Sequence, residues 1–125
     1  MLSDARAEAA APVMRLDRAR EFYEGVLGLV PTEEHTPGVD VTYACAGGTQ
    51  LMLYEWAGTT TRSHTVAHFI ADDVAATVAA LRARGVRFDE PDLPELEVVD
   101  GVAIVGGHRF AWFKDPDLNI LGIHD

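Results

Sequence analysis

The sequence predicts an α+β fold made of two similar modules, each with the element order βαβββ. Two segments have the apolar spacing of amphipathic helices, and each is followed by short alternating or apolar runs of the kind that form strands. The polar segment 57–64 separates the two halves. We therefore expect a single domain over residues 1–125, with the first module at about 5–57 and the second at about 65–125.

The first predicted helix covers residues 16–27 and comes after an alanine-rich segment that only weakly indicates a strand. Its apolar residues recur at helical spacing and are Leu16, Ala19, Tyr23, Val26 and Leu27. Gly28 is expected to end the helix, because glycine accepts the left-handed conformation found at helix C-termini.

The second predicted helix covers residues 73–84, with Val74, Val78 and Leu81 on one face. Asp72 or Asp73 is expected to cap its start, and Gly85 is expected to end it.

Strands are predicted after each helix. Residues 39–46 and 49–56 form a predicted β-hairpin around Gly47-Gly48. The strands predicted in the second half are 65–71, 86–88, 98–105 and the two arms of the C-terminal segment 111–124. Residues 89–97 hold two prolines and five acidic residues, so we expect a surface loop there.

Composition narrows the function classes. The chain carries 20 acidic and 10 basic side chains, a net charge of −10, which disfavours binding to nucleic acid or to anionic membranes. No apolar run reaches the length of a membrane span, and the N-terminal segment lacks the pattern of a signal peptide. Cys45 is the single cysteine and has no partner for an internal disulfide, so we expect a reducing, cytoplasmic location. Without an activating neighbour at a recognisable spacing, we expect a structural thiol there.

The C-terminal segment AWFKDPDLNILGIH, residues 111–124, is the most informative part of the chain. An aromatic strand leads into Asp115-Pro116-Asp117, and a second apolar strand leaves after Asn119. Proline fixes φ and the Asx side chains bond the local backbone, so this segment predicts a tight turn.

This segment resembles the strand-turn-strand that ends a module of the vicinal oxygen chelate superfamily, which contains glyoxalases, bleomycin-resistance proteins, extradiol dioxygenases and fosfomycin-resistance enzymes. Four other segments resemble the same superfamily in the right order: LDRAREFYEGVLGL, GGTQLMLYEW, TVAHFIADD and AALRARGVRF. The resemblance implies that the two modules form a cupped, partly open mixed β-sheet barrel with the helices outside. It also implies a ligand site on the concave face and a homodimer.

The resemblance and the alternation of side chains along strands together predict which residues face the cup. If Leu51 and Leu53 pack on the helices, the expected ligand-binding residues are Gln50, Met52, Tyr54, Trp56, Val66, His68, Ile70, Ile120, Gly122 and His124. Trp112 is a further candidate, although its strand could instead place Ala111 and Phe113 inward. Phe69 is expected to lie buried behind the sheet. For Met52, Tyr54 and Trp56, packing between the two modules remains an equal alternative.

The resemblance also indicates where a metal site would lie in this sequence. Metal-dependent relatives use four ligands, which transfer here to Glu8, Met52, Val66 and Gly122. Only Glu8 could coordinate a hard divalent ion, because valine and glycine offer no ligand and a thioether suits zinc or magnesium poorly. The sequence therefore predicts no metal and no cofactor, and disfavours glyoxalase or dioxygenase chemistry. An unorthodox site made by Glu8, His68 and His124 is the remaining alternative.

Leu118 departs from the family pattern, which has glycine at this position of the turn. A leucine with positive φ costs about 1 kcal/mol or more, so we expect the turn to adjust instead.

The sequence thus predicts a small-molecule-binding protein with a metal-free concave pocket that sequesters a cationic or aromatic compound. The competing hypothesis is an isomerase or lyase of the same superfamily. It would be either metal-free, with His68 and Glu8 as an acid-base pair, or dependent on displaced metal ligands. A histidine that only lines the cup is the simpler interpretation of His68. A third interpretation is a structural or regulatory partner of another protein, with a cup that no longer binds a ligand.

Overall fold

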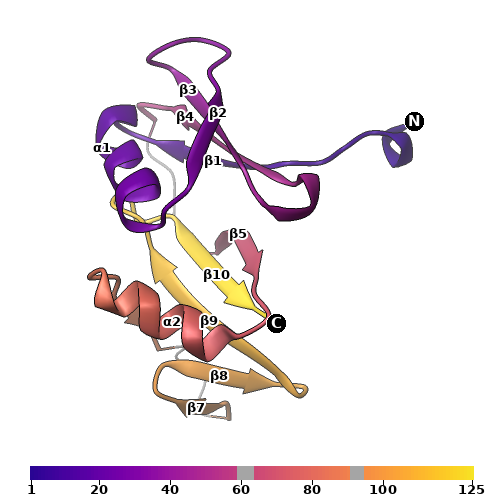
Figure 1. The fold of residues 1–125 in the computed structure, drawn as a ribbon, viewed down its shortest axis with the longest axis vertical. Helices are drawn as coiled ribbons and strands as arrows, with labels where there is room; N and C mark the ends of the chain where they lie inside the picture. Colours follow the sequence, from indigo (N-terminus) through magenta and orange to yellow (C-terminus); the bar gives the residue numbers. More distant parts are fainter. Residues whose placement is uncertain (59–63, 91–94) are drawn as a thin grey trace. The chain divides into compact units, whose positions relative to one another are not determined.

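The computed structural model describes residues 1–58, 64–90 and 95–125. The chain divides into two compact units, Met1–Thr60 and Thr61–Asp125. Each unit combines a β-sheet with one main helix, so the predicted α+β class is confirmed (Figure 1). The predicted linker 57–64 and acidic loop 89–97 lie partly outside the described residues.

The first unit follows the predicted order βαβββ. Its elements are η1 (Leu2–Asp4), β1 (Ala9–Val13), α1 (Leu16–Arg20), η2 (Glu21–Val26), β2 (Val30–Glu33), β3 (Asp40–Ala44), η3 (Ala46–Gly48) and β4 (Gln50–Glu55). The strands form one sheet in the order β1-β4-β3-β2, with β1 parallel to β4 and the other pairs antiparallel. The predicted hairpin around Gly47 is confirmed as the β3-β4 pair.

The first helix has the predicted length but not a uniform geometry. Its first five residues are α-helical, and from Glu21 to Val26 the chain continues as a π-helix. The Leu27 N–H donates to the Phe22 carbonyl at 3.0 Å, which is the i→i+5 spacing of a π-turn. Gly28 follows with φ of +76°, as expected for a residue that ends a helix.

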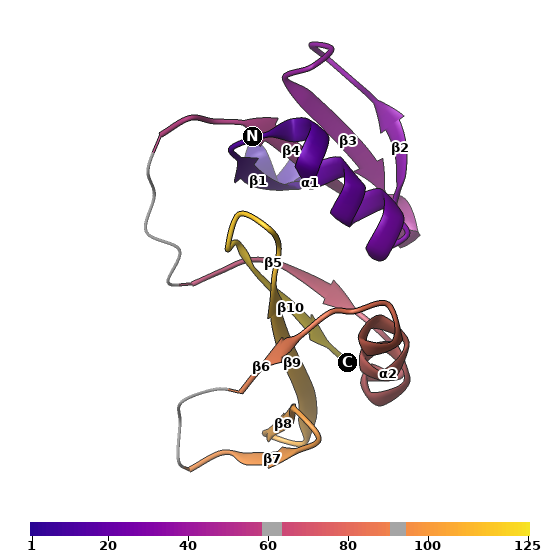
Figure 2. The same ribbon diagram turned by 90° about the vertical axis from the view of Figure 1, so that its left-hand side faces the viewer.

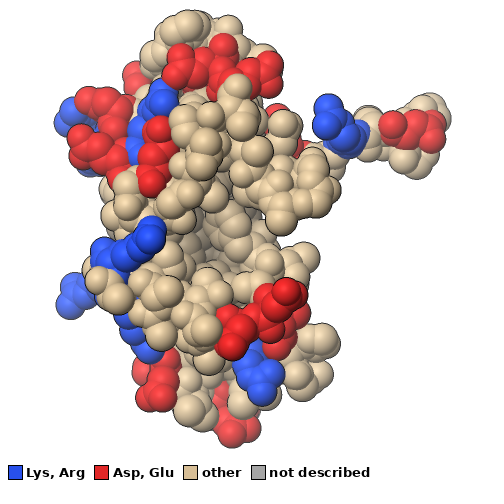
Figure 3. Space-filling view, viewed as in Figure 1, with Lys and Arg blue, Asp and Glu red and all other residues tan. Residues whose placement is uncertain are grey.

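The start of α1 is hydrogen-bonded to Glu55, the last residue of strand β4. Arg15 occupies the N-cap position without a side-chain cap, and the Leu16 N–H donates to Glu55 Oε2 at 3.0 Å. Asp17 accepts from the Arg18 N–H at 2.8 Å and pairs with Arg15 at 2.9 Å. Acidic and basic side chains therefore lie next to one another over α1 (Figure 3). The N-terminal backbone donors of α1 are satisfied by carboxylates.

The core of the first unit lies between α1 and one face of its sheet. Leu16, Ala19 and Tyr23 are buried on the helical side. The buried apolar residues of the sheet alternate along their strands and are Ala11, Val13, Val41, Tyr43, Leu51 and Leu53. This is the arrangement predicted from alternation, in which Leu51 and Leu53 pack toward the helix.

The second unit contains the remaining elements: β5 (Thr65–Ile70), α2 (Val74–Ala83), β6 (Phe88–Asp89), β7 (Glu97–Val99), β8 (Val102–Val105), β9 (His108–Lys114) and β10 (Ile120–His124). Its sheet has the order β5-β10-β9-β8-β7, and β6 pairs separately with β9. β10 is parallel to β5 and antiparallel to β9. Helix α2 lies against one face of this sheet, over β9 (Figure 2).

The predicted boundaries of α2 are confirmed. Asp73 is its N-cap, and its carboxylate accepts from the Ala76 N–H at 2.9 Å. Gly85 follows the helix with φ of +91°. Val74 and Val78 are buried, while Leu81 is half-buried.

The prediction of a single strand at 98–105 is wrong. The chain forms two antiparallel strands here, β7 and β8, joined by a tight turn at Asp100-Gly101. Both residues have positive φ, at +51° and +78°. An Asp-Gly pair between apolar residues is a strong hairpin signal, because both central positions of the favoured turn require positive φ.

The expectation that the turn adjusts around Leu118 is also wrong. Leu118 has φ of +67°, and its side chain is exposed. The turn is fixed by Asp115, whose carboxylate accepts from the backbone N–H groups of Asp117 at 2.9 Å and Asn119 at 2.8 Å. The side-chain amide of Asn119 donates to the same carboxylate at 2.8 Å. These hydrogen bonds hold the backbone in place and leave Leu118 in the left-handed conformation.

Over the described part of the chain, no helix has both the length and the apolar character that crossing a membrane requires.

Candidate functional site

The most developed candidate site lies on the second unit, on the sheet face turned away from α2. Four ring side chains from three neighbouring strands meet there, around one glycine. We call this set the aromatic face; its members are His68, Phe110, Trp112, Gly122 and His124. They come together because Gly122 pairs with His68 on one side and with Trp112 on the other, while His124 pairs with Phe110.

The rings form a continuous array. Trp112 stacks on Phe110 with centroids 5.8 Å apart and planes at 12°, and Phe110 stacks on His124 at 5.1 Å and 29°. His68 meets the edge of His124 at 5.0 Å. These separations are within the range of favourable ring pairs. Phe110, Trp112 and His124 are half-buried and His68 is exposed, so the array presents ring surface to solvent.

The opposite face of the same sheet forms the core against α2. The residues that alternate with the aromatic face are buried and are Ala67, Ala111, Phe113, Leu121 and Ile123. The predicted orientation of β10, with Leu121 and Ile123 turned away from the site, is therefore confirmed. Trp112, whose orientation the sequence left open, lies on the aromatic face. Phe69 is half-buried instead of buried as expected, because β5 is the edge strand of its sheet.

Gly122 is essential to the close approach of the rings. A Cβ at this position would lie 3.1 Å from Cδ2 and 3.2 Å from Nε2 of His68, and 3.4 Å from Cδ1 of Trp112. The space where a side chain at position 122 would begin is thus taken by the imidazole of His68. The lack of a side chain at Gly122 allows both rings to pack on the backbone of β10.

The environment of His68 favours its neutral form. Partial burial of the imidazole, and after it the neighbouring imidazole of His124, lower the pKa of His68 below its ordinary value near 6.5. Nδ1 of His124 is 3.0 Å from the carbonyl oxygen of Asp125, which orients that ring. A neutral imidazole at pH 7 can accept a proton or a hydrogen bond.

The remaining candidates of the second unit lie at the edges of the aromatic face. Val66 and Ile120 are half-buried, and Val66 lies at a register shift between β5 and β10. Ile70 is 77% exposed and lies beside His124 in the register. Ile70 alternates with His68 along β5, and Ile120 alternates with Gly122 along β10.

The candidates of the first unit lie on the sheet face turned away from α1. Met52 and Tyr54 are half-buried, and they pair across the sheet with Thr42 and Asp40. Gln50 lies at the start of the same strand. Trp56 follows the strand and is 51% exposed. Their contact with a ligand remains a prediction.

Glu8 lies before β1 and is exposed, in a polar hollow that also includes Glu33, His35 and Gln50. Glu8 belongs to the first unit and His68 to the second. Their action as an acid-base pair remains a prediction.

The residues at the four family ligand positions do not fit a metal ion. Met52, Val66 and Gly122 supply no hard ligand, and a Cβ at position 122 would lie within 3.1 Å of the His68 ring. Among residues 1–58, 64–90 and 95–125, no three His, Cys, Asp or Glu side chains are grouped as a metal site would require.

Phe110 is the member of the aromatic face that sequence reasoning missed. It alternates with Trp112 in the segment HRFAWFK, so the orientation of Trp112 also determines that of Phe110. Strand β9 has aromatic residues on both faces, so alternation alone does not show which face carries the site. The pairing of Trp112 with Gly122 shows it.

The comparison with protein families decides the identity of this fold. The family model described as the Glyoxalase/Bleomycin resistance protein/Dioxygenase superfamily matches residues 6–122. The chain belongs to this superfamily. Its fold is the glyoxalase/bleomycin resistance fold, as the sequence resemblance predicted.

Solved structures of other superfamily proteins agree. A glyoxalase/bleomycin resistance protein from Streptomyces sp. CB03234 is 27% identical, with a TM-score of 0.67 over 95% of this chain and 100% of that chain. TnmS3, an antibiotic binding protein from the same organism, is 28% identical, with a TM-score of 0.64 over 94% of this chain and 93% of that chain.

A lactoylglutathione lyase from Agrobacterium tumefaciens is 21% identical, with a TM-score of 0.67 over 96% of this chain and 92% of that chain. At this identity the likeness concerns the fold alone. No curated protein sequence matches the chain significantly. The chain is thus a member of a superfamily that includes small-molecule-binding proteins.

Proposed function

We propose that this protein binds a small planar organic molecule, cationic or aromatic, and sequesters it without a metal ion. The observation that carries the proposal is the aromatic face, where stacked rings are presented to solvent instead of being covered by the core. Exposed aromatic surface of this kind is typical of sites for flat apolar ligands. Met52, Tyr54 and Trp56 of the first unit are proposed as further ligand contacts.

Three features support a cationic or neutral ligand. Ring faces attract cations. The lowered pKa of His68 keeps that imidazole uncharged near pH 7. The chain as a whole carries a net charge of −10, which attracts cations from a distance. TnmS3, a similar protein, is an antibiotic binding protein, which supports a small organic molecule as the ligand.

A second candidate function is catalysis by an isomerase or lyase of the superfamily. The exposed, neutral imidazole of His68 favours this alternative, because it is suited to proton transfer near neutral pH. Glu8 would be its partner in the metal-free version. The binder hypothesis is preferred because the structure orients His68 through ring packing, and no described hydrogen bond connects it to an acid.

We further propose that the protein is a homodimer located in the cytoplasm. The superfamily resemblance supports dimerisation. Large apolar side chains that are exposed in the first unit, Met14, Val30 and Val39, would contribute surface to an interface. Sedimentation velocity measures the oligomeric state directly, and a monomer at all concentrations would contradict the proposal.

The proposed function predicts binding without a metal ion. After purification without chelator, elemental analysis should show no stoichiometric zinc, nickel, manganese or iron. Isothermal titration with proflavine, a planar aromatic cation, should give the same affinity before and after EDTA treatment. Stoichiometric metal, or loss of binding after chelation, would contradict the metal-free site.

A matched pair of variants separates binding from catalysis. His68→Ala should keep the fold and change affinity modestly if the protein is a binder. If any substrate is turned over, the same variant should abolish turnover while His108→Ala, at the exposed start of β9, leaves it unchanged. Turnover that survives in His68→Ala would remove this residue from the proposed mechanism.

A further inference from the structure

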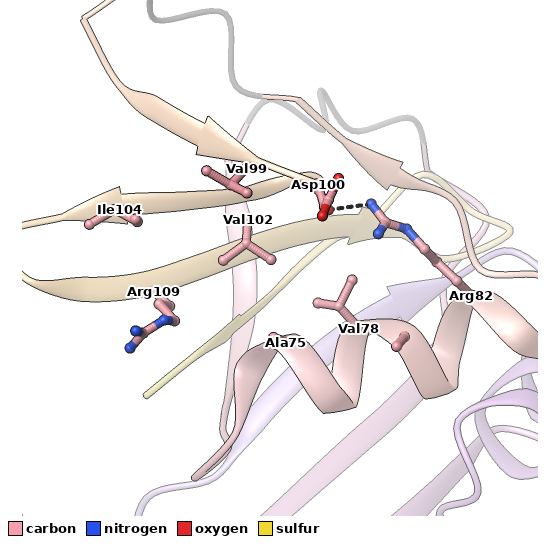
Figure 4. Close-up of a pocket in the computed structure, with 9 residues that line it drawn as sticks. Ala75, Val78, Arg82, Val99, Asp100, Val102, Ile104 and Arg109 are labelled. Carbon is pink, nitrogen blue, oxygen red and sulfur yellow. Dashed lines mark hydrogen bonds between the residues drawn. The ribbon is translucent and has the colours of Figure 1, made fainter.

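The sheet of the second unit has a hollow on the face opposite the aromatic face, between α2 and strands β7, β8 and β9 (Figure 4). Its walls are mainly apolar and include Ala75, Val78, Ala79, Val99, Val102 and Ile104. Its volume is about 350 Å³, within the range of small-molecule pockets. We call it the α2 groove; it belongs entirely to the second unit and shares no residue with the aromatic face.

The groove exists because α2 presents small side chains where large ones would complete the core. Ala75 and Ala79 are four residues apart, so they lie on one face of the helix and line the groove together. Both are exposed, and Val99 opposite them is 53% exposed. Protein interiors are normally close-packed, but the small alanine side chains leave this apolar surface uncovered. Uncovered apolar surface of this kind is available to a ligand.

An arginine borders each end of the groove, as Figure 4 shows. Arg82 is fixed in place, since its Nη2 donates to the carbonyl oxygen of Asp100 at 2.6 Å and its guanidinium lies 5.5 Å from the centre of the Phe88 ring. Gly101 makes this possible, because a Cβ there would lie 2.4 Å from Arg82 Nη2. The charge of Arg109 is matched differently, by Asp125 at 3.3 Å.

The partner of Arg82 in this contact is a carbonyl and not a carboxylate. Its positive charge is therefore not neutralised by the hydrogen bond, and a guanidinium has five N–H donors, of which this bond uses one. Asp100 also lines this end of the groove, and it lies exposed in the turn between β7 and β8. A preorganised guanidinium beside an apolar wall is suited to a ligand with one anionic oxygen group and an apolar body.

We propose that the α2 groove binds a small amphipathic carboxylate, such as a medium-chain fatty acid. The carboxylate pairs with the guanidinium of Arg82, and the hydrocarbon chain lies over Val78 and Val102 between the helix and the strands. This site is independent of the proposed function on the aromatic face, because it takes an anionic ligand on the opposite side of the sheet.

Titration of the isotope-labelled protein with decanoate, followed by NMR of the valine, isoleucine and leucine methyl groups, tests the proposal. The methyl signals of Val78, Val102 and Ile104 should shift, while the indole signal of Trp112 stays unchanged. Arg82→Gln should weaken decanoate binding about tenfold, as expected for loss of one charge-assisted pair. Arg84→Gln, which removes a charge just beyond the same helix, should bind decanoate like the parent protein.

A second pair of variants tests the shape of the groove. Ala79→Leu fills the groove and should abolish decanoate binding, whereas Ala80→Leu, at an exposed position of α2 outside the groove, should not. Decanamide, which lacks the charge, should bind at least tenfold more weakly than decanoate. Absence of decanoate binding at millimolar concentration, equal binding by Ala79→Leu, or shifts at Trp112 instead of Val78 would overturn the proposal. The first two outcomes leave ligand binding at the aromatic face untested, whereas shifts at Trp112 would place decanoate on that face.

Discussion

At the scale of single residues, His68 shows how a site is formed by side chains that no motif identifies. Its imidazole lies over Gly122, with Nε2 3.2 Å from the place where a Cβ would be, and edge-on to His124 at 5.0 Å. Desolvation and the neighbouring imidazole both lower its pKa. The chemistry of His68 therefore depends both on the missing side chain at Gly122 and on the imidazole of His124, two residues of the neighbouring strand β10.

We predict that His68 titrates below pH 6.5 in the folded protein. NMR of the imidazole carbon-bound protons should give this midpoint. His124→Gln should shift it upward, toward the ordinary value, because one of the two causes is removed. His108→Gln is the control, since His108 lies at the exposed start of β9, and the His68 midpoint should not move. A midpoint at or above 6.5 in the parent protein would contradict this account of His68.

The sign of the effect on stability follows from the same shift. Because the folded pKa is lower than that of the unfolded chain, the unfolded state binds more protons between the two values. The contribution of His68 to stability is therefore complete above about pH 6.5 and is lost as pH falls through the folded pKa. Binding of a cationic ligand at the aromatic face should weaken over the same interval, since His68 becomes positively charged.

Leu118 is the second residue whose behaviour is specific to this chain. Its φ of +67° is costly for a side chain with a Cβ. Leu118→Gly should raise the free energy of unfolding by about 0.5–1 kcal/mol, which is the relief of strain less the extra entropy of glycine in the unfolded chain. Urea unfolding measures this difference.

The control for Leu118 is Leu118→Ala, which removes the exposed side chain but keeps the Cβ. It should leave stability nearly unchanged. If Leu118→Ala stabilised the protein as much as Leu118→Gly does, the effect would come from the exposed leucine side chain and not from the backbone conformation.

At the scale of elements, the C-terminal turn is held by one buried carboxylate. Asp115 is 3% exposed and accepts hydrogen bonds from the backbone N–H groups of Asp117 and Asn119 and from the Asn119 side chain. Asp115→Ala should lower the free energy of unfolding by about 2–3 kcal/mol, because it leaves these donors without their acceptor. Asp115→Asn should cost less, since its amide oxygen can still accept from the backbone. Equal losses in thermal or urea unfolding would argue against specific hydrogen bonding.

The elements also show how much of the fold the sequence predicts. Both helices, the first hairpin and the C-terminal strand pair were predicted, because apolar periodicity and glycines define them locally. The division of 98–105 into β7 and β8 was missed, because five valines and isoleucines dominate that segment and hide the Asp100-Gly101 turn. The π-helical half of the first helix was also missed, since its apolar spacing matches that of an α-helix.

The candidate site was less predictable than the fold. Alternation along β5 and β10 placed His68, Gly122 and His124 on one face, as the structure shows. It could not decide β9, which carries aromatic residues on both faces, and so Phe110 was missed. The packing of His68 into the space at Gly122 depends on the pairing of two strands far apart in sequence, and no local pattern encodes it.

At the scale of the whole molecule, family membership and ligand chemistry give different information. The superfamily match over residues 6–122 establishes the fold. Met52, Val66 and Gly122, which the resemblance places at the ligand positions of metal-dependent relatives, supply no hard ligand. One fold can host many functions, so the aromatic face carries the functional argument here.

The central claim is that the aromatic face binds the ligand, and the two tryptophans allow a direct test of it. Trp112 belongs to that face, and Trp56 belongs to the first unit. Single-tryptophan variants, Trp56→Phe and Trp112→Phe, should be titrated with proflavine while tryptophan fluorescence is followed. The account predicts saturable quenching of Trp112 in the Trp56→Phe variant, with weaker binding when Phe110→Ala is added. Unchanged Trp112 fluorescence at saturating proflavine, or the same affinity after Phe110→Ala, would contradict it.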